Sequence, residues 1–341
     1  MGNWINEEGP ESDIIFSSRV RLARNVKGYR FPHMMSVEEA KKIIQKCSDA
    51  ILKSNTVLSK EFRLIELSKI TPTDRMAMVE QHVISPGLVD NCEKSAVLIN
   101  KDSTVSIMIN EEDHIRLQVI YPGFQLREVY ELASNIDDVI EENIDYAYDQ
   151  KIGYLTACPT NIGTGIRASV MLHLPGLSVT KNINGMLNAV SQVGLTIRGI
   201  YGEGSNVQGN IYQISNQITL GLSEEEIISN LAAVTKQLID KERAARQRLK
   251  ESNMTMVEDT AWRSLGILKN ARILSSSECL NLLSNVRLGK ELGIIDGIDP
   301  ILLNEIMINM QPANLVKREG KELSPELRDI KRAEYVREKL K

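Results

Sequence analysis

The residues best suited to chemistry lie in the segment CPTNIGTGIR, which runs from Cys158 to Arg167. Cysteine carries a thiol that can ionise, and arginine carries a planar guanidinium that binds phosphate through two parallel hydrogen bonds. Gly163 and Gly165 would let backbone N–H groups approach a ligand closely, because glycine has no Cβ. The turn therefore predicts a binding site in which Arg167 holds a phosphate. A packed structural role is the alternative for Cys158, since many cysteines act as small hydrophobes.

A second group of arginines stands in the segment SSRVRLARN, from Ser17 to Asn25. Alternation along a strand places Arg19 and Arg21 on one face, about 7 Å apart, and Val20 on the other. Two guanidinium groups held this close repel each other unless an anion lies between them. The segment predicts an anion-binding strand face, although a solvated face would show the same pattern.

Three carboxylates follow one another in the segment NEEDHIR, at Glu111, Glu112 and Asp113. Acidic residues are common in hairpin turns, where they can be simply solvated. The neighbouring Arg116 repeats the pattern of an arginine projecting from a strand, so a functional cluster is the competing interpretation. His82, one of four histidines in the chain, could likewise be structural or part of a site.

Strands and helices must position these groups, and hydrophobic periodicity with two capping boxes predicts where they lie. The predicted strands cover Ser17 to Asn25, Phe62 to Leu67, Ala96 to Asn100, Val105 to Asn110, His114 to Tyr121, Ala168 to Leu174, Leu195 to Ile200 and Ile211 to Ser215. The predicted helices cover Ser36 to Leu52, Leu126 to about Gln150, Asn182 to Val193, Ser223 to roughly Leu249, Ser277 to Leu288, Pro300 to Met310 and Pro325 to Leu340. The strand signal ends near residue 250, where we place a domain boundary.

Composition excludes several classes of protein. The chain has 341 residues, 42% hydrophobic and 25% charged, and can bury a large core. Its four cysteines form no CxxC pair, which argues against a zinc ribbon or a disulfide framework and favours a reducing, cytoplasmic compartment. No signal peptide or membrane-spanning run is evident. The net charge of -4 gives no general attraction to nucleic acid.

Several segments, in the order SSRVRLARN, NEEDHIR, CPTNIGTGIRASV and RGIYGEG followed by YQISNQ, resemble the signature blocks of the phosphagen (guanidino) kinase superfamily. This resemblance covers roughly residues 14 to 245. Nearly the whole chain is similar to the bacterial protein arginine kinases of the McsB type. The small-molecule members carry a sizeable helical domain before the first block and lack a helical tail after residue 250, which separates them from this chain.

The resemblance implies an α+β fold. An antiparallel sheet flanked by helices would form a catalytic domain over residues 14–249. A helical C-terminal domain over residues 250–341 would serve dimerisation and phosphoarginine binding. The implied reaction transfers the γ-phosphoryl group of ATP to the guanidinium of arginine residues in proteins, and a small-molecule guanidino kinase is the alternative. Mg²⁺ would be held mainly by the nucleotide phosphates, with no metal site built by the protein.

Partners also follow from the resemblance. Protein substrates could include a heat-shock transcriptional repressor, and phosphorylation would mark proteins for Clp-type proteolysis during stress. An activator protein and a homodimer are implied as well. No partner in a membrane and no direct nucleic-acid partner is expected.

The resemblance assigns roles to individual residues. Glu112 would be the catalytic carboxylate, and Cys158 would be a thiolate that contacts the guanidinium. A guanidinium is a poor nucleophile while protonated, so a carboxylate must orient it and accept a proton. The nucleotide would contact Ser17, Ser18, Arg19, Val20, Arg21, His82, Arg116, Arg167, Ala168, Ser169, Val170, Met171, Tyr201, Gly202, Glu203, Gly204, Ser205 and Asn206.

One position departs from the family pattern, because Asn206 occupies the place of a second catalytic carboxylate. Asparagine can orient a guanidinium through its carbonyl oxygen but cannot accept a proton. One carboxylate could suffice, nearby Glu203 could substitute, or the chain could be a weakly active regulatory pseudokinase. We expect a working enzyme, because the arginines, Glu112 and Cys158 are all present.

The helical tail contains the run RDIKRA, with Arg328, Asp329, Arg332 and Ala333. On a helix that begins at Pro325, the two arginines are four residues apart and share a face. A solvated charged helix is the plain interpretation. The resemblance implies instead an allosteric site at which these residues bind phosphoarginine.

Overall fold

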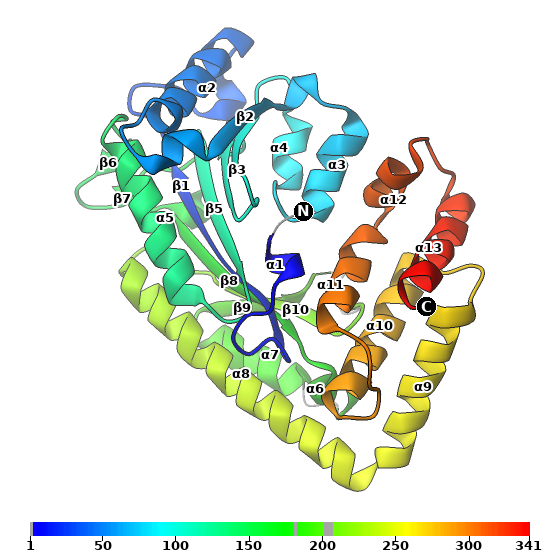
Figure 1. Ribbon diagram of the computed structural model, residues 1–341. Coiled ribbons are helices and arrows are strands. Elements are labelled where there is room, and N and C mark those ends of the chain that lie inside the picture. Colours follow the sequence, from blue (N-terminus) through cyan, green and yellow to red (C-terminus); the bar gives the residue numbers. More distant parts are fainter. Residues whose placement is uncertain (1–2, 181–182, 201–206) are drawn as a thin grey trace.

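The computed structural model describes residues 3–180, 183–200 and 207–341. An eight-stranded sheet with the order β2-β3-β4-β5-β1-β8-β10-β9 runs through it, and every paired neighbour is antiparallel (Figure 1). This confirms the antiparallel sheet. Its strands are β1 (Ile15–Arg24), β2 (Phe62–Glu66), β3 (Ala96–Asn100), β4 (Val105–Ile109), β5 (Ile115–Pro122), β8 (Ile166–His173), β9 (Leu195–Gly199) and β10 (Ile211–Asn216). A separate hairpin is formed by β6 (Tyr148–Asp149) and β7 (Gly153–Tyr154).

Strand β1 lies in the middle of the sheet, between β5 and β8. Val20 is paired with Val119 of β5 and with Ala168 of β8, and all three are fully buried. Arg19 and Arg21 point to the opposite side, because successive side chains of a strand alternate. The sheet therefore has an apolar face and a face that carries arginine.

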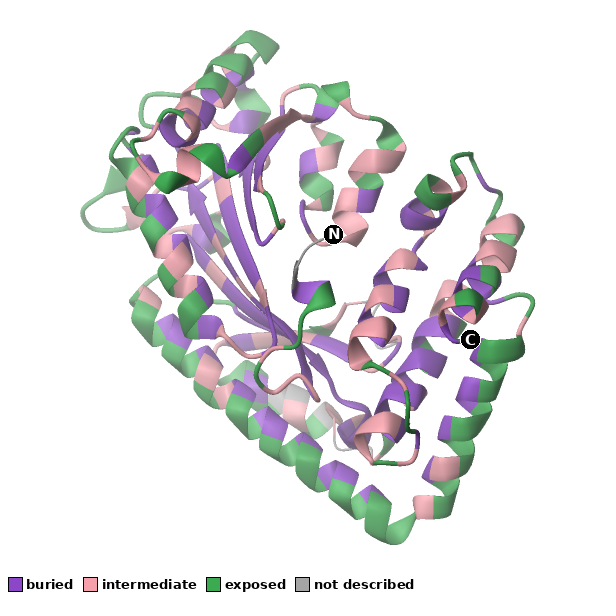
Figure 2. Cartoon of the chain, in the orientation of Figure 1, coloured by how far each residue is buried: buried purple, intermediate pink, exposed green. Residues whose placement is uncertain are grey.

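Helices cover the apolar face of the sheet. Figure 2 shows that most of the sheet's strands are buried. One hydrophobic cluster joins the strands to α2 (Val37–Leu52), α5 (Leu126–Glu141), α7 (Ile183–Gln192) and α8 (Glu224–Ser252). The capping boxes expected at Ser36 and Ser223 are both formed, and each opens its helix. No helix within the described ranges is long and apolar enough to cross a membrane.

The prediction of one helix from Leu126 to about Gln150 is wrong in its second half, because α5 ends at Glu141. Ile144 continues the apolar spacing of α5 and is buried, which explains the error. Beyond α5 the backbone instead returns to the end of β1, where the Ala147 N–H donates to the Asn25 carbonyl at 2.7 Å. The bridge between Tyr146 and Val26, just beyond β1, satisfies backbone groups that a longer helix would have paired internally.

Residues after 250 are helical. Their elements are α9 (Met254–Asn270), α10 (Ser276–Glu291), α11 (Pro300–Asn309), α12 (Pro312–Glu319) and α13 (Pro325–Lys339). These helices share a hydrophobic cluster with Phe16, Ile120 and Met171, which lie on the arginine-bearing face of the sheet. The helical region therefore packs against one end of that face. Sequence periodicity located α10, α11 and α13 but not α9 or the short α12.

Short helices connect the larger elements. They are α1 (Asn3–Asn6), α3 (Pro72–Glu80), α4 (Pro86–Asp90) and α6 (Pro175–Val179), with single 3-10 turns at Pro32–Met34, Val57–Lys60, Leu67–Lys69 and Pro159–Asn161. The sequence analysis did not predict α3, which contacts α12. Both carboxylate oxygens of Glu80 accept N–H groups from the first turn of α12, at Ala313 (2.7 Å) and Asn314 (2.8 Å). Glu80 thus caps a helix of the C-terminal region.

Candidate active site

Strand register brings arginines from several strands to one face of the sheet. Arg21 of β1 is paired with Arg167 of β8, so the two side chains point the same way. Arg116 of β5 is paired with Ala23, two residues along β1, and shares that face. Arg198 of β9 joins them through its pairing with β10. The arrangement expected from SSRVRLARN and CPTNIGTGIR is therefore present, with one arginine more than predicted.

Arg19 is held by two neutral side chains. Its Nε donates to Ser169 Oγ at 3.3 Å, and its Nη2 donates to Gln213 Oε1 at 2.7 Å. Burial, followed by the charges of neighbouring arginines, lowers the pKa of Arg19 to about 10. The guanidinium therefore stays charged at neutral pH without a carboxylate among these partners. A charge held in this way is suited to binding an anion.

Arg21 and Arg167 each have an Nε that is buried and lacks a hydrogen-bond partner among the described residues. Burial, then the charges of nearby arginines, lowers the pKa of Arg21 well below its usual value. The pKa of Arg167 is lowered by the same two causes, and the charges of Cys158 and Glu112 oppose that shift. Buried donors of this kind are costly unless a ligand pairs with them.

Arg116 forms an ion pair with Glu111, whose other carboxylate oxygen accepts the hydroxyl of Ser85. Ser85 in turn caps α4 by accepting the Leu88 N–H. Glu111 is therefore engaged on both oxygens in this structure. It orients Arg116 toward the other arginines.

The two acids that follow Glu111 differ in their surroundings. Glu112 is exposed at the tip of the turn between β4 and β5. Asp113 is buried, and its Oδ1 accepts the Asn25 amide at 2.6 Å and the Ala157 N–H at 2.7 Å. Burial raises the pKa of Asp113, and these two hydrogen bonds oppose the rise. Asp113 thus fixes the loop before Cys158, whereas Glu112 is accessible to a substrate.

Cys158 is half-buried at the start of the 3-10 turn Pro159–Asn161. Its Sγ lies 3.0 Å from the hydroxyl of Thr160, and its carbonyl accepts the hydroxyl of Thr156 at 2.8 Å. These contacts restrain the sulfur within the loop that precedes β8. The structure therefore does not bury Cys158 as a packed hydrophobe.

Gly163 and Gly165, expected to let backbone N–H groups approach a ligand, are also required by the protein's own packing. Both have positive φ, +108° and +65°. A Cβ on Gly163 would lie 2.3 Å from the Thr219 carbonyl oxygen, and one on Gly165 would lie 2.6 Å from that of Ala23. The glycines are therefore required because neighbouring backbone passes close to them. Their backbone packing shapes the loop that carries Cys158.

His82 reaches the arginine face from the loop after α3. It has φ of +58°, and its Nε2 is buried without a hydrogen-bond partner in the described part of the chain. Burial, then the charge of Arg19, lowers the pKa of His82 to about 4, so the imidazole is neutral at pH 7. It lines a cavity together with Ser17, Arg19, Ile120, Ser169, Met171, Ile200 and Gln213.

Other residues expected at the nucleotide have side chains on the opposite face. Val20, Ala168 and Val170 are fully buried in the cluster beneath the helices. The Ser18 hydroxyl is also buried and donates to the Gly123 carbonyl at 2.8 Å. These side chains support the strands rather than the face that carries arginine. The expected residues Tyr201, Gly202, Glu203, Gly204, Ser205 and Asn206 lie outside the described residues.

Within the RDIKRA run, Arg332 is 2% exposed and bonds to the protein itself. Its Nε donates to the Met310 carbonyl at 2.9 Å, its Nη1 donates to the Leu274 carbonyl at 2.7 Å, and it pairs with Asp329. Ala333 is fully buried. Arg328 is half-buried, and its charge opposes the rise that burial causes in the pKa of Glu80.

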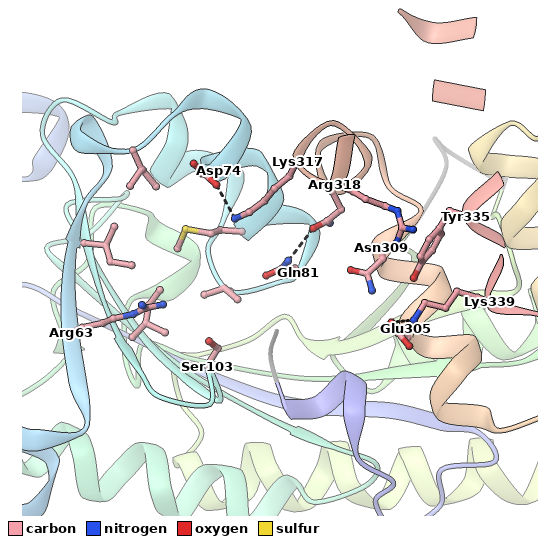
Figure 3. A pocket seen from close by; sticks show the side chains of 16 residues that line it. Arg63, Asp74, Gln81, Ser103, Glu305, Asn309, Lys317, Arg318, Tyr335 and Lys339 are labelled. Carbon is pink, nitrogen blue, oxygen red and sulfur yellow. Dashed lines mark hydrogen bonds and ion pairs between the residues drawn. The ribbon is translucent and has the colours of Figure 1, made fainter. Parts of the chain in front are cut away.

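A larger cavity, of about 600 Å³, lies apart from the arginine face, between β2, α3 and the helices α11 to α13 (Figure 3). Two of its cations are paired within the helical region, Lys339 with Glu305 and Arg318 with Glu338, and two polar contacts join the helical region to α3 and the residue that follows it. Lys317 contacts Asp74 at 2.8 Å, and the Gln81 amide donates to Asn314 Oδ1 at 2.9 Å. None of the residues that the sequence assigned to a site lines this cavity.

Sequence reasoning missed Arg198 and Gln213 as members of the site. Arg198 stands at an alternating position of the predicted strand Leu195 to Ile200, so strand periodicity could have shown that it projects from one face. Gln213 is the polar residue inside the strand IYQIS. The register between β8 and β10 places Gln213 on the face with Arg19, and the register between β10 and β9 adds Arg198.

No group of three or more His, Cys, Asp and Glu side chains in residues 3–180, 183–200 and 207–341 is arranged to hold a metal ion. Glu111 and Asp113 are already bonded to protein groups. The cationic face fits a polyphosphate, and a phosphate-bound Mg²⁺ would fit such a site.

Comparison with known proteins agrees with this chemistry. The family model of ATP:guanido phosphotransferase, C-terminal catalytic domain, matches residues 42–245. The model of the protein-arginine kinase McsB C-terminal domain matches residues 254–341. Among solved structures, lombricine kinase is similar, with a TM-score of 0.60, 28% identity, and coverage of 70% of this chain and 68% of that chain.

Curated relatives match over nearly their full length. A protein-arginine kinase of Caldanaerobacter subterraneus subsp. tengcongensis is 54% identical over 326 residues, which is 96% of each chain. A protein-arginine kinase of Clostridium acetobutylicum is 51% identical over 341 residues, the whole of both chains. Matches to both the catalytic region and the helical tail confirm the resemblance, and the chain therefore belongs to the ATP:guanido phosphotransferase family and, within it, to the protein-arginine kinases.

Proposed function

We propose that the chain transfers the γ-phosphoryl group of ATP to the guanidinium of arginine residues in proteins. One observation carries this proposal: Arg21 and Arg167 point from adjacent strands to one face, each with a buried, unpaired Nε. Crowded cations of this kind repel one another until a polyanion binds between them. The same charges would stabilise negative charge on the equatorial oxygens of the phosphoryl group during transfer.

The triphosphate would bind along the arginine face, with Arg19, Arg21, Arg116 and Arg167 as its main contacts and Arg198 beside them. The rest of the nucleotide would extend toward the cavity that His82 lines with Ser17 and Ser169. Mg²⁺ would be held by phosphate oxygens and water, where it supplies further positive charge. The arginines would also orient the γ-phosphorus toward the acceptor, which reduces the entropy cost of the reaction.

The acceptor guanidinium would lie between Glu112 and Cys158. The negative charges of these two side chains oppose the lowering of the Arg167 pKa. Glu112 would orient the guanidinium and accept one of its protons as the new N–P bond forms. The bond between the γ-phosphorus and its bridging oxygen breaks, and that oxygen leaves with ADP. Cys158, held beside Thr160, would position the guanidinium by hydrogen bonding.

The helical region over residues 250–341 would regulate the catalytic region over residues 14–249. Arg328 and Asp329 of α13 would bind the phosphate and the guanidinium of phosphoarginine. Arg332 would act indirectly, because its bonds to Met310 and Leu274 fix the position of α13. Binding at this site would stimulate the kinase.

Dimerisation would use α9, which exposes large apolar side chains to solvent. Met256 is 53%, Trp262 52% and Ile267 42% exposed. Burying such side chains in a symmetric interface would stabilise a homodimer. We also propose cytoplasmic protein substrates, a heat-shock repressor among them, with an activator protein and a Clp-type protease as partners.

The test supplies ATP with two alternative acceptors, free arginine or unfolded casein. We expect acid-labile phosphate on casein and none on free arginine, because the acceptor is an arginine within a protein. Transfer to free arginine alone would make the chain a small-molecule guanidino kinase. Absence of transfer to either acceptor, with ATP still bound, would make it a regulatory pseudokinase.

A further inference from the structure

The short helix α1 lies between the sheet and α11 (Figure 1). Trp4 and Ile5 of α1 are 1% and 0% exposed. They belong to a hydrophobic cluster that includes Ile120 and Met171 from the sheet and Met307 from α11. Two of these neighbours, Ile120 and Met171, also line the cavity of His82. The packing around Trp4 therefore reaches the wall of that cavity.

Trp4 also contacts His82 directly. The two ring centroids are 5.5 Å apart, and the ring planes make an angle of 75°. This edge-to-face arrangement is a favoured geometry for aromatic pairs. The Trp4 ring therefore restricts the direction in which the imidazole points.

The backbone of His82 is fixed separately. Its N–H donates to the Val79 carbonyl at 2.9 Å, and its carbonyl accepts the Gln118 amide at 2.8 Å. Its φ of +58° is uncommon for a residue other than glycine and must be stabilised by its surroundings. With the backbone fixed by hydrogen bonds and the ring by Trp4, Nε2 is left buried and unpaired at the cavity. Because burial and the charge of Arg19 lower the His82 pKa to about 4, this ring is neutral at pH 7 and suits an apolar neighbour.

We propose that Trp4 is a positioning residue for nucleotide binding, which holds the His82 ring so that Nε2 meets the bound ATP. Helix α1 would thereby support the nucleotide site through Trp4. This inference rests on the proposed function, since ATP is the ligand that His82 would meet.

Intrinsic fluorescence tests the inference without relying on catalysis. The chain has two tryptophans, Trp4 and Trp262, so Trp262→Phe leaves Trp4 as the single reporter. Titration of this full-length variant with ATP should change the Trp4 emission until it saturates. The dissociation constant from the emission should equal the one measured by calorimetry. ATP binding by calorimetry with no change in emission overturns the role of Trp4. Absence of ATP binding contradicts the proposed function itself, and the inference fails with it.

Kinetics of paired variants give the second measurement. Trp4→Leu keeps an apolar side chain but loses the aromatic contact, and should raise the KM for ATP about tenfold with kcat unchanged. Trp4→Phe keeps an aromatic ring and should restore most of the ATP affinity. Ile5→Ala is the control, because it loosens the same helix and cluster without removing the ring that contacts His82. An effect of Ile5→Ala equal to that of Trp4→Leu would make Trp4 an ordinary core residue. If Trp4→Leu does not fold, the fluorescence titration alone decides.

Discussion

Arg21 of β1 and Arg167 of β8 lie directly opposite each other in an antiparallel register, with both side chains on one face of the sheet. Like charges in directly opposed positions destabilise a sheet. Both Nε atoms are also buried without a partner in the described ranges. The fold therefore maintains an unfavourable arrangement that an anionic ligand would relieve, and this relationship leads to the first prediction.

Arg167→Ala should weaken ATP binding and leave the ATP-free protein as stable as before or more stable. Loss of a charge-assisted contact costs about 1.5–3 kcal/mol, or roughly 10- to 150-fold in affinity. In the ATP-free protein, the substitution removes the repulsion between Arg167 and Arg21, so the free energy of unfolding should not fall and could rise. Calorimetry with ATP and thermal unfolding measure the two effects. Arg248→Ala, at an exposed position of α8, is the matched control and should change neither. Unchanged ATP affinity in Arg167→Ala would remove this residue from the nucleotide site.

Glu112→Gln should abolish most phosphoryl transfer and leave ATP binding nearly intact. The glutamine amide can still contact a guanidinium but cannot accept its proton, so turnover should fall by about 10²- to 10⁴-fold. Transfer rate and ATP affinity are measured on the same preparation. Glu111→Gln is the informative comparison, since Glu111 pairs with Arg116 and should affect ATP affinity as well. Full activity of Glu112→Gln beside an inactive Glu111→Gln would assign the general base to Glu111.

The second carboxylate of the family pattern is either missing, because Asn206 stands in its place, or replaced by Glu203. Substitutions at the two positions distinguish these alternatives. If the missing carboxylate limits the rate, Asn206→Glu should raise turnover and Glu203→Gln should have little effect. If Glu203 has taken over proton acceptance, Glu203→Gln should lower turnover and Asn206→Glu should add nothing. We expect the first result, because a single carboxylate at Glu112 suffices for slower transfer. The three proteins are compared on one arginine-bearing substrate.

Stability should depend on pH through His82. Its pKa is about 4 in the folded protein, against 6.5 for the ordinary side chain. Between these values the unfolded chain binds a proton that the folded chain does not, so the free energy of unfolding falls as pH falls from about 6.5 toward 4. Asparagine does not titrate in this range, so His82→Asn should reduce the fall in the free energy of unfolding. It also tolerates the positive φ at this position. Urea unfolding at about pH 7 and about pH 5 measures the difference. His33→Asn, at an exposed histidine, is the control and should keep the pH dependence of the parent. If His82→Asn and the parent had the same pH dependence, His82 would not be a buried neutral histidine.

Arg328→Ala should remove stimulation by phosphoarginine while basal kinase activity persists. Arg332→Ala should instead lower thermal stability, because it leaves the Met310 and Leu274 carbonyls without their donor, at about 1–3 kcal/mol for each buried group. The double variant Asp329→Ala with Arg332→Ala should show both losses. Phosphoarginine titration by calorimetry, the kinase rate and thermal unfolding separate binding from folding. Equal binding and equal stimulation in Arg328→Ala would leave RDIKRA as a structural helix.

Local patterns predicted much of this site. Alternation in SSRVRLARN correctly placed Arg19 and Arg21 on one face, and capping boxes correctly located the starts of α2 and α8. Periodicity within a segment does not show which distant strands pair or in what register. For that reason Arg198 was missed, although its strand was predicted, and the opposition of Arg21 and Arg167 appeared only in the structure.

Other features depend on neighbours that lie far away in the sequence. Gly163 and Gly165 suggested a ligand turn, but Thr219 and Ala23 explain why a side chain is excluded there. The helix expected up to Gln150 stopped at Glu141, and the chain that follows it pairs with the segment just beyond β1. Each case reflects tertiary contacts that override a local pattern.

Mass spectrometry of the product shows whether the chain places phosphate on arginine side chains of proteins. Casein incubated with ATP and the full chain is digested and analysed under conditions that preserve acid-labile phosphate, with Glu112→Gln as the parallel control. We expect phosphorylated arginines in casein with the parent chain and a large loss of them with Glu112→Gln. Phosphate found only on serine, threonine or tyrosine, or arginine phosphorylation that is equal with both proteins, would contradict this expectation.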